Sequence, residues 1–252
     1  MSSSADRPVA LVTGAASGIG RATARRLATD GYYVVAFDRD AEGLETLLAD
    51  HPQSMATEIA DLARLEEVES RMTSAVATYG VPAAVVNAAG IALVATVLEN
   101  DLASWQRVMD VNLNAPMLVC RAVIPPMIAA GGGAIINVAS AASFRGVRGR
   151  AAYCAAKHGL VGLTRAVTAD HAADGIRANA VCPGTVETGY TQAVLSVAEE
   201  PQATRDFMTQ RQLIGRMGTP EEVANAIAFM AGPEASFLYG ASIVLDGGRS
   251  VL

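Results

Sequence analysis

The 252-residue sequence predicts an α/β fold, and two observations carry that prediction. Short runs rich in Val, Ile and Ala, such as residues 9–13 and 134–139, have the length of buried strands and alternate with helical segments. The first of these runs ends at a glycine-rich turn that opens directly into a helical segment. No linker, repeat or low-complexity tract interrupts the chain, so we expect one domain over residues 1–252.

The glycine-rich turn after residues 9–13 predicts a binding site for a dinucleotide. Glycines let the backbone approach a pyrophosphate closely, and the helix N-terminus supplies free N–H groups and the positive end of a dipole. The residues that we expect to contact the dinucleotide here are Gly14, Ser17, Gly18, Ile19 and Gly20.

Asp38, at the end of the second predicted strand, predicts the choice of cofactor. It stands about twenty positions after the glycine turn, where a carboxylate can accept hydrogen bonds from the adenosine ribose. The same carboxylate would repel the extra phosphate of NADP, so we expect NAD as the cofactor. Arg39 leaves residual NADP use open, because an arginine can accommodate that phosphate. Asp38 could also serve as the N-cap of a helix from residue 41.

The next two strand ends extend the predicted cofactor site. Asp61 follows a third strand at residues 54–58 and precedes a helical run over 62–78. Its default role there is the N-cap of that helix, and the alternative is a contact to the adenine of the cofactor. A fourth strand at 82–86 is followed by small residues that leave room for a flat ligand. We expect Asn87, Ala89 and Gly90 to line that space.

Residues 101–129 are predicted to form one long helix, interrupted at Pro116 and closed by Pro125, Pro126 and the glycines at 131–133. Asn112 lies in an apolar stretch of this helix, where asparagine is unfavourable by propensity. Its amide therefore either bonds a backbone group or has a task of its own.

The residue types that can carry chemistry lie between positions 140 and 157. Ser140 follows the apolar run 134–139, so its hydroxyl lies at the carboxyl end of a strand, where open α/β sheets bind ligands. Tyr153 and Lys157 are four residues apart in a predicted helix and share one face. An ammonium favours the phenolate form of a neighbouring phenol, which can then exchange a proton with an alcohol or ketone. Such a pair can equally be an ordinary amphipathic face.

The last third of the chain is predicted to contain two more strands and a lid. Residues 177–182 and 241–246 have strand character, and Thr219 begins a helix with proline and acidic residues in its first turn. The polar segment 189–213 between them is expected to be a lid that closes over the substrate.

Composition argues against several classes of protein. The net charge of −6 and the lack of a basic block disfavour nucleic acid as a partner, and no uninterrupted apolar run has the length of a membrane span. The three cysteines and three histidines are scattered, which predicts neither a disulfide framework nor a metal site. Residues 1–7 lack the apolar core of a signal peptide and look like a disordered lead. We therefore expect a cytoplasmic protein.

Together these motifs resemble the short-chain dehydrogenase/reductase family. The matching motifs are Thr13-Gly-x-x-x-Gly-x-Gly, Asn87-Ala-Ala-Gly, Asn112, Ser140, Tyr153-x-x-x-Lys157 and Pro183-Gly. The resemblance implies a three-layer, doubly wound Rossmann-type fold, with a seven-stranded parallel sheet and helices on both faces. It also implies a homotetramer whose interfaces use the helices near 101–129 and 151–173 and the C-terminal strand.

The resemblance also implies roles for individual residues. The serine at 140 would position the carbonyl, Tyr153 would be the acid/base, Lys157 would favour its phenolate and bind the nicotinamide ribose, and Asn112 would hold a water in a proton relay. The segment after the sixth strand would contact the nicotinamide through Pro183, Gly184, Val186 and Thr188.

The C-terminal third is similar to a narrower group, the cytosolic type 2 3-hydroxybutyrate dehydrogenases and related sugar and sugar-acid dehydrogenases. In the hydroxybutyrate enzymes arginines bind the substrate carboxylate; two of those positions match Arg150 and Arg211, and the third is Val194. We therefore predict an NAD-dependent dehydrogenase of a small secondary alcohol, a hydroxy acid or sugar acid. The alternatives are an enzyme of neutral ketones, polyols or cyclic sugars, and a non-catalytic dinucleotide sensor, against which the intact Ser–Tyr–Lys set argues.

Overall fold

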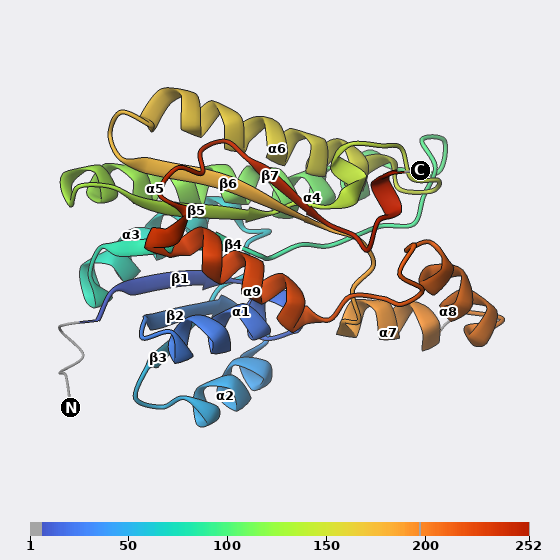
Figure 1. Ribbon diagram of the computed structural model, residues 1–252, viewed down its shortest axis with the longest axis horizontal. Helices are drawn as coiled ribbons and strands as arrows, with labels where there is room; N and C mark the ends of the chain where they lie inside the picture. Colours follow the sequence, from blue (N-terminus) through green and yellow to red (C-terminus); the bar gives the residue numbers. More distant parts are fainter. Residues whose placement is uncertain (1–6, 197, 252) are drawn as a thin grey trace.

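The computed structural model describes residues 7–196 and 198–251, and within them seven parallel strands form one sheet in the order β3-β2-β1-β4-β5-β6-β7 (Figure 1). The strands are β1 (Val9–Thr13), β2 (Tyr33–Asp38), β3 (Met55–Ile59), β4 (Pro82–Asn87), β5 (Gly133–Val138), β6 (Ile176–Pro183) and β7 (Ser242–Leu245). This arrangement confirms the doubly wound, Rossmann-type sheet that the family resemblance implies. The lead expected at residues 1–7 lies, apart from Arg7, outside the described residues.

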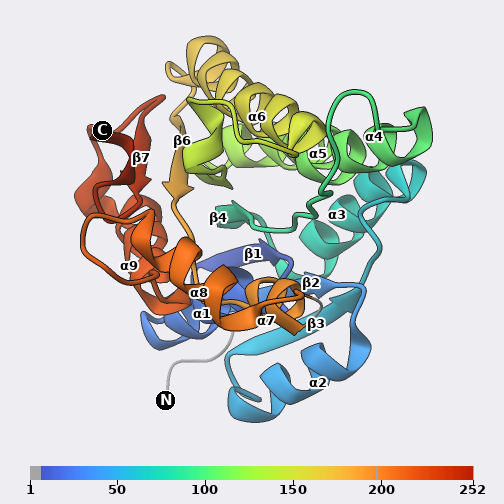
Figure 2. The same ribbon diagram turned by 90° about the vertical axis from the view of Figure 1, so that its right-hand side faces the viewer.

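Helices cover both faces of the sheet, as Figure 2 shows in the view toward one end of the strands. One face is packed by α1 (Gly18–Thr29), α2 (Ala41–Asp50) and α9 (Pro220–Ala231). The other is packed by α3 (Leu65–Tyr79), α5 (Ala115–Ala129) and α6 (Ala151–His171), with α4 (Leu102–Met109) beside α6. These layers explain why the central strands are continuous apolar runs: a parallel strand covered on both faces has no side that favours polar residues.

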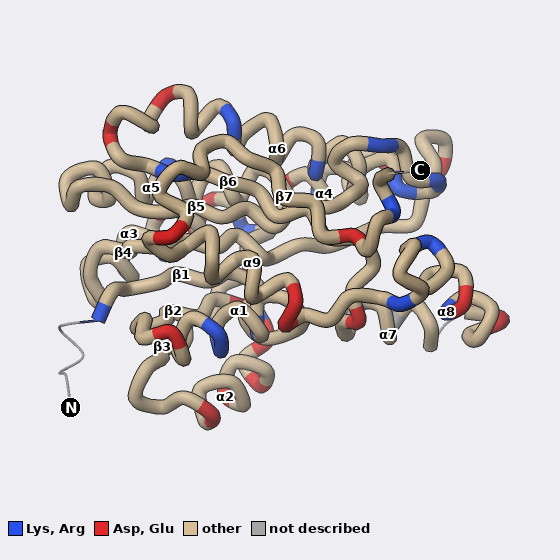
Figure 3. Tube along the Cα trace, in the orientation of Figure 1, with Lys and Arg blue, Asp and Glu red and all other residues tan. Residues whose placement is uncertain are grey.

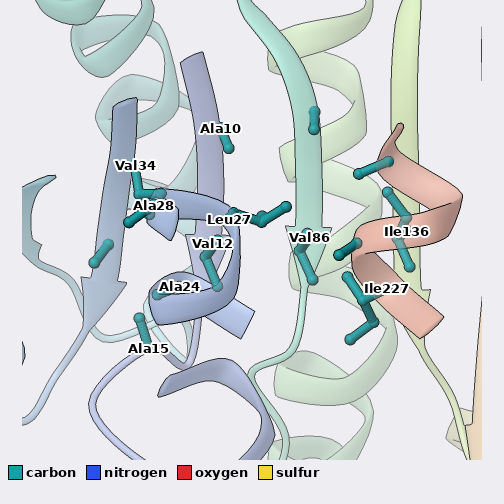
Figure 4. Close-up of a cluster of buried hydrophobic side chains, with 14 of the residues drawn as sticks. Ala10, Val12, Ala15, Ala24, Leu27, Ala28, Val34, Val86, Ile136 and Ile227 are labelled. Carbon is teal, nitrogen blue, oxygen red and sulfur yellow. The ribbon is translucent and has the colours of Figure 1, made fainter. Parts of the chain in front are cut away.

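The core on the α1 and α9 side is built from small and branched side chains (Figure 4). Leu27 of α1 and Ile227 of α9 are fully buried; Leu27 lies beside β1, and Ile227 lies beside Val86 and Ile136 of β4 and β5. Burying a side chain of the size of Leu or Ile contributes about 1.5–3 kcal/mol to folding. The alanine-rich composition follows, because small residues let these helices lie close to the strands.

Arg177 of β6 ties the sheet to the end of α9. Its guanidinium donates four hydrogen bonds of 2.9–3.2 Å to the carbonyl oxygens of Met230, Ala231, Gly232 and Ala235. A helix leaves its last carbonyls without helical partners, so a cation there satisfies the acceptors and complements the helix dipole. These bonds thereby fix the segment after α9, which leads to the final strand, β7.

The segment 101–129 differs from the predicted helix. The structure has α4, a π-helical turn (Asp110–Asn114) and then α5. The break therefore lies at the π turn, and Pro116 instead stands in the first turn of α5, where its missing N–H needs no helical partner. Pro125 and Pro126 lie inside α5, whose neighbouring side chains Ile124 and Met127 are buried against the sheet.

Within the described residues, one helical stretch, Leu102–Ala129, is long and apolar enough by composition to cross a membrane. Half of its most apolar window is buried inside the fold, where α5 supplies much of the core under the sheet. Its hydrophobicity is therefore explained by packing against β4 and β5.

Beyond the carboxyl ends of the strands stand α7 (Gly189–Ser196) and α8 (Pro201–Gln210) (Figure 1). Strand β1 lies inside the sheet, with β2 on one side and β4 on the other. The strand order reverses at this point, and ligands of open α/β folds bind in the crevice that the reversal leaves. The pair α7–α8 overhangs that side of the molecule.

Candidate active site

A cavity of about 470 Å³ opens at the carboxyl ends of the strands. It is lined by side chains from β1 through the C-terminal turn, so it draws on nearly the whole chain. Every site residue predicted from the sequence lines it except Asn87. That asparagine is buried in β4, where its Nδ2 donates to Oδ1 of Asn137 at 2.8 Å.

The glycine turn fits a pyrophosphate group. A Cβ added at Gly20 would lie 2.1 Å from the carbonyl oxygen of Gly14, and one added at Gly14, whose φ is +68°, would lie 2.7 Å from Ala89. Only glycine allows this close packing. Ser17 is the N-cap of α1, and within the described chain its side chain makes no capping bond and the first turn carries no acid. The amino end of α1 is thus available to an anion.

Thr13 joins the glycine turn to the loop after β4. Its Oγ1 accepts hydrogen bonds from the backbone N–H groups of Ala88 at 3.1 Å and Ala89 at 3.2 Å. These bonds fix the wall on which a flat ligand would lie. Sequence reasoning assigned Thr13 no role of its own, because these partners are 75 and 76 residues away.

Asp38 lies beside the glycine turn and is not a helix cap. Its Oδ2 accepts from the backbone N–H of Ala16 at 3.0 Å, and its Oδ1 from that of Asp40 at 3.1 Å. The N-cap of α2 is Asp40, whose side chain accepts from Gly43. The capping alternative for Asp38 was therefore wrong by two residues. Arg39 lines the cavity beside it.

Asp61 lines the cavity, but the expected helix cap is absent. Helix α3 begins at Leu65 with Arg64 as N-cap, three residues later than predicted. Asp61 instead forms a local turn, in which its Oδ1 accepts from the N–H of Ala63 at 3.0 Å. Leu62, next to it, is buried in the core, which holds this stretch outside the helix.

Ser140, Tyr153 and Lys157 lie together at the end of β5. Ser140 caps a short 3-10 turn (Ala141–Ser143), and its Oγ accepts from the N–H of Ala142 at 3.1 Å. Lys157 is only 4% exposed; its Nζ donates to the carbonyl oxygen of Val138 at 2.7 Å and lies 5.8 Å from the Tyr153 ring centroid. Burial lowers the pKa of Lys157 to about 8. The spacing of four residues does bring tyrosine and lysine side by side.

Ser143 couples this group to the turn that carries Ser140. Its Oγ donates to the carbonyl oxygen of Lys157 at 2.8 Å and receives a bond from the N–H of Ser140 at 3.3 Å. These two bonds fix the position of the Ser140 turn relative to α6, the helix that carries Lys157. The sequence offered a signal for this contact only in the capping-box pair Ser140 and Ser143.

The family model described as enoyl-(acyl carrier protein) reductase matches residues 14–250. The chain belongs to the short-chain dehydrogenase/reductase family. Cis-4-hydroxycyclohexanecarboxylate dehydrogenase of Sinomonas cyclohexanicum is 42% identical over 247 residues, which cover 97% of this chain and 97% of that protein. Cyclohexanol dehydrogenase of Acinetobacter sp. (strain SE19) is 39% identical over 251 residues, with coverage of 98% and 96%.

A solved structure extends the comparison to three dimensions. The Beutenbergia cavernae protein, described as a candidate NAD(P)-dependent gluconate 5-dehydrogenase with NADP bound at low occupancy, has a TM-score of 0.90. It is 38% identical, and the match covers 97% of each chain. The present chain is accordingly a short-chain dehydrogenase/reductase acting on CH–OH groups with a nicotinamide dinucleotide.

Asn112 of this dehydrogenase lies in the π turn and faces the reactive end of the cavity. Its Nδ2 donates to the carbonyl oxygens of Ile91 at 2.8 Å and Val108 at 2.9 Å. Its Oδ1 is buried without a hydrogen-bond partner in the described part of the chain. A Cβ on Gly90 would lie 2.9 Å from that oxygen and 3.5 Å from Nζ of Lys157, so both groups border the same glycine.

The two predicted substrate arginines reach the cavity from different elements. Arg150 is the N-cap of α6, and Arg211 follows α8, where its guanidinium lies 5.1 Å from the ring centroid of Phe207. Burial, and then the charges of Arg145 and Arg150, lower the pKa of Arg211. Val194, the third position of the hydroxybutyrate set, is in α7 and does not line the cavity.

The loop 183–188 closes the site next to the glycine turn. A Cβ on Gly18 would lie 3.2 Å from Cγ2 of Thr188, so this loop and α1 are in contact. Pro183, Gly184 and Val186 line the cavity with it. Within residues 7–196 and 198–251, no group of His, Cys, Asp and Glu side chains has the arrangement of a metal site.

Proposed function

We propose that this protein is an NAD-dependent dehydrogenase that interconverts a small hydroxy acid or sugar acid and its ketone. One observation carries the proposal: the glycine turn, the pair Tyr153 and Lys157, and the two arginines Arg150 and Arg211 all line a single cavity. Cofactor, acid–base group and anion site would then share one cavity, as a hydride transfer needs.

In the proposed reaction, residues of this chain would accept the proton of the substrate hydroxyl and position its oxygen. A bound nicotinamide would exchange a hydride with the carbinol carbon. The phenol oxygen of Tyr153 takes the proton of the substrate hydroxyl, and Lys157 favours the phenolate that does so. Ser140 orients the same oxygen through its hydroxyl, and Lys157 also binds the nicotinamide ribose. The free Oδ1 of Asn112 accepts a hydrogen bond from a water that relays the proton onward.

The preference for NAD rests on Asp38 in this proposal. Its carboxylate already accepts two backbone N–H groups, and it lines the cavity where the adenosine ribose would lie. A negative charge there disfavours a 2′-phosphate. Arg39 is the opposing residue, and the related Beutenbergia cavernae structure is described with NADP. The remaining adenosine and nicotinamide contacts would come from Asp61 and from the loop around Thr188.

The carboxylate of the substrate would bind Arg150 and Arg211. A guanidinium binds a carboxylate with two parallel hydrogen bonds, which lysine cannot copy. The Sinomonas cyclohexanicum relative, named for a carboxylate substrate, supports this proposal. The second candidate is a neutral secondary alcohol, which the apolar Val194 and the cyclohexanol-named relative favour.

We further propose one domain that assembles as a cytoplasmic homotetramer, with 189–213 as its lid. The lid is supported by Met208 and Arg211, which line the cavity from α8. The tetramer is supported by exposed apolar side chains at the expected interfaces, including Leu102 on α4, Met117 on α5 and Val244 on β7. We propose neither a membrane nor a nucleic acid as a partner.

The test is NADH formation at 340 nm with a panel of hydroxy acids, their methyl esters and neutral alcohols. We expect oxidation of acids in preference to esters, and a loss of about 10²–10⁴-fold in kcat for Tyr153→Phe with NAD binding retained. Arg150→Met and Arg211→Met should remove the preference for acids. A protein that binds NAD but oxidises no alcohol would be a sensor, and equal use of acid and ester would support the neutral-alcohol alternative.

A further inference from the structure

A third arginine, Arg145, lies in the wall of the cavity with part of its guanidinium unpaired. Its Nη1 donates to the carbonyl oxygen of Arg249 at 3.2 Å, which anchors the side chain against the C-terminal turn (Arg249–Val251). Its Nε and Nη2 are buried and, within residues 7–196 and 198–251, have no hydrogen-bond partner. These two atoms form the edge of the guanidinium that can bind a carboxylate with two parallel bonds.

Leaving that edge unpaired is costly. A buried donor without a partner destabilises a protein by about 1–3 kcal/mol, and a charged donor by more. Buried polar groups without partners are accordingly rare and call for an explanation. Arg145 also lines the cavity, where an anionic ligand could supply the missing partner.

The surroundings of Arg145 are strongly basic. Arg150, Arg211 and Arg249 line the cavity with it, and only two acids in the described chain, Asp38 and Asp61, line it, both at the ends of β2 and β3. Figure 3 shows several basic segments close to the C-terminal end of the chain, and both basic and acidic segments on and beside α8. The whole chain has a net charge of −6, so this concentration of cations is local.

Three arginines of this wall have no ion pair with a carboxylate in the described residues. Arg145, Arg211 and Arg249 have no acidic oxygen within 4.0 Å there, whereas the surface arginines Arg25 and Arg26 have ion pairs. The charges of Arg145 and Arg150 both act on Arg211, so the three guanidinium groups are near one another. A substrate with one carboxylate would leave most of this charge uncompensated.

We infer that Arg145, anchored by the C-terminal turn, binds a second anionic group of the substrate. The substrate is then a small secondary alcohol with two anionic groups, such as a hydroxy dicarboxylate or a hydroxy acid with a phosphate group. This inference rests on the proposed function, in which Arg150 and Arg211 take the first carboxylate. It assigns the specificity for dianions to Arg145.

The test uses calorimetric titration of the full-length protein, saturated with NAD, with compounds that cannot be oxidised. Glutarate is compared with its monoamide, which has the same shape and one charge fewer, and with 3-phosphonopropionate, in which a phosphonate replaces one carboxylate. We expect one or both dianions to bind about ten- to a hundredfold more tightly than the monoamide, as one charge-assisted pair would give. The preferred dianion identifies the second group as a carboxylate or a phosphate.

Substitutions of single arginines test whether Arg145 is the source of the preference for dianions. Arg145→Met should remove it, and Arg145→Lys should restore only a small part, because lysine lacks the two-pronged geometry. Arg148→Met is the matched control, since Arg148 is exposed on the same loop and does not line the cavity. Thermal unfolding of each variant checks that the fold is intact.

Equal binding of the monoamide and both dianions to the wild type would overturn the inference, as would a preference that survives Arg145→Met. Turnover separates this result from the proposed function. If 3-hydroxybutyrate is oxidised but dianions have no advantage, only the inference fails. If dianions bind through Arg145 and neither 3-hydroxyglutarate nor any other alcohol is oxidised, the anion site stands and the proposed dehydrogenase activity fails.

Discussion

Lys157 provides a quantitative test of how the site is built, because the fold buries a cation there at a cost. Its pKa is about 8 in the folded protein, against about 10.4 for lysine in an unfolded chain. That difference corresponds to about 3 kcal/mol of destabilisation at neutral pH. The hydrogen bond from Nζ to the carbonyl of Val138 offsets only part of this cost.

The pH dependence follows from the direction of the change in pKa. Between pH 8 and about 10.4 the unfolded chain binds a proton at Lys157 that the folded protein has released, so raising the pH removes the penalty. The free energy of unfolding of the wild type should therefore rise relative to Lys157→Met by about 2 kcal/mol between pH 7 and pH 9.5. Titrating groups that do not interact with Lys157 are common to both proteins and cancel in the difference.

The measurement is urea unfolding of both proteins at pH 7.0, 8.0, 9.0 and 9.5, followed by circular dichroism. The lost bond to Val138 in Lys157→Met adds a constant offset to the difference between the two proteins, whereas the titration of the lysine adds a slope. A difference that stays constant with pH within about 0.5 kcal/mol would show that the ammonium is not desolvated as the structure indicates. Catalytic turnover should be lost in the variant at every pH.

Three further substitutions test other parts of the fold and site. Asp38→Ala should weaken NAD binding and reduce the preference for NAD over NADP, measured as the ratio of the kcat/KM values for the two cofactors. A wild type that prefers NADP would contradict the assignment of this preference to Asp38. Gly20→Ala places a Cβ 2.1 Å from a backbone oxygen of the glycine turn, so NAD affinity by fluorescence titration should fall at least about tenfold. Gly162→Ala, in open space on α6, is its control and should leave that affinity unchanged. Arg177→Met leaves four carbonyl oxygens without their donor and should lower the free energy of unfolding by about 2–4 kcal/mol, whereas the exposed Arg165→Met should change it by less than about 0.5 kcal/mol.

Local patterns predicted the features that depend on neighbouring residues. The strands were recognisable because a parallel strand covered on both faces must be apolar throughout. The glycine turn was recognisable because backbone contacts such as that of Gly20 with Gly14 exclude any side chain. The Tyr153 and Lys157 pair followed from helical spacing alone.

Features that depend on distant contacts could not be predicted in the same way. The π turn carries Asn112, whose amide bonds to Ile91, a residue that folding brings there from 21 positions away. Pro125 and Pro126 usually end helices, but the burial of their neighbours outweighs that preference. Arg145 has no role in the predictions from the sequence, because its anchor at Arg249 is 104 positions along the chain.

The order of the strands has a consequence for biosynthesis. Beginning with β5, each strand that leaves the ribosome joins the strand made just before it, always on the same side of the sheet. Until Ser242–Leu245 has been translated, β6 is the open edge, and all its residues except Arg177 are buried in the finished protein. An unpaired apolar edge of this kind templates association with other chains. A stop codon shortly before Ser242 should therefore yield an aggregating protein, although the cavity would lack few of its residues.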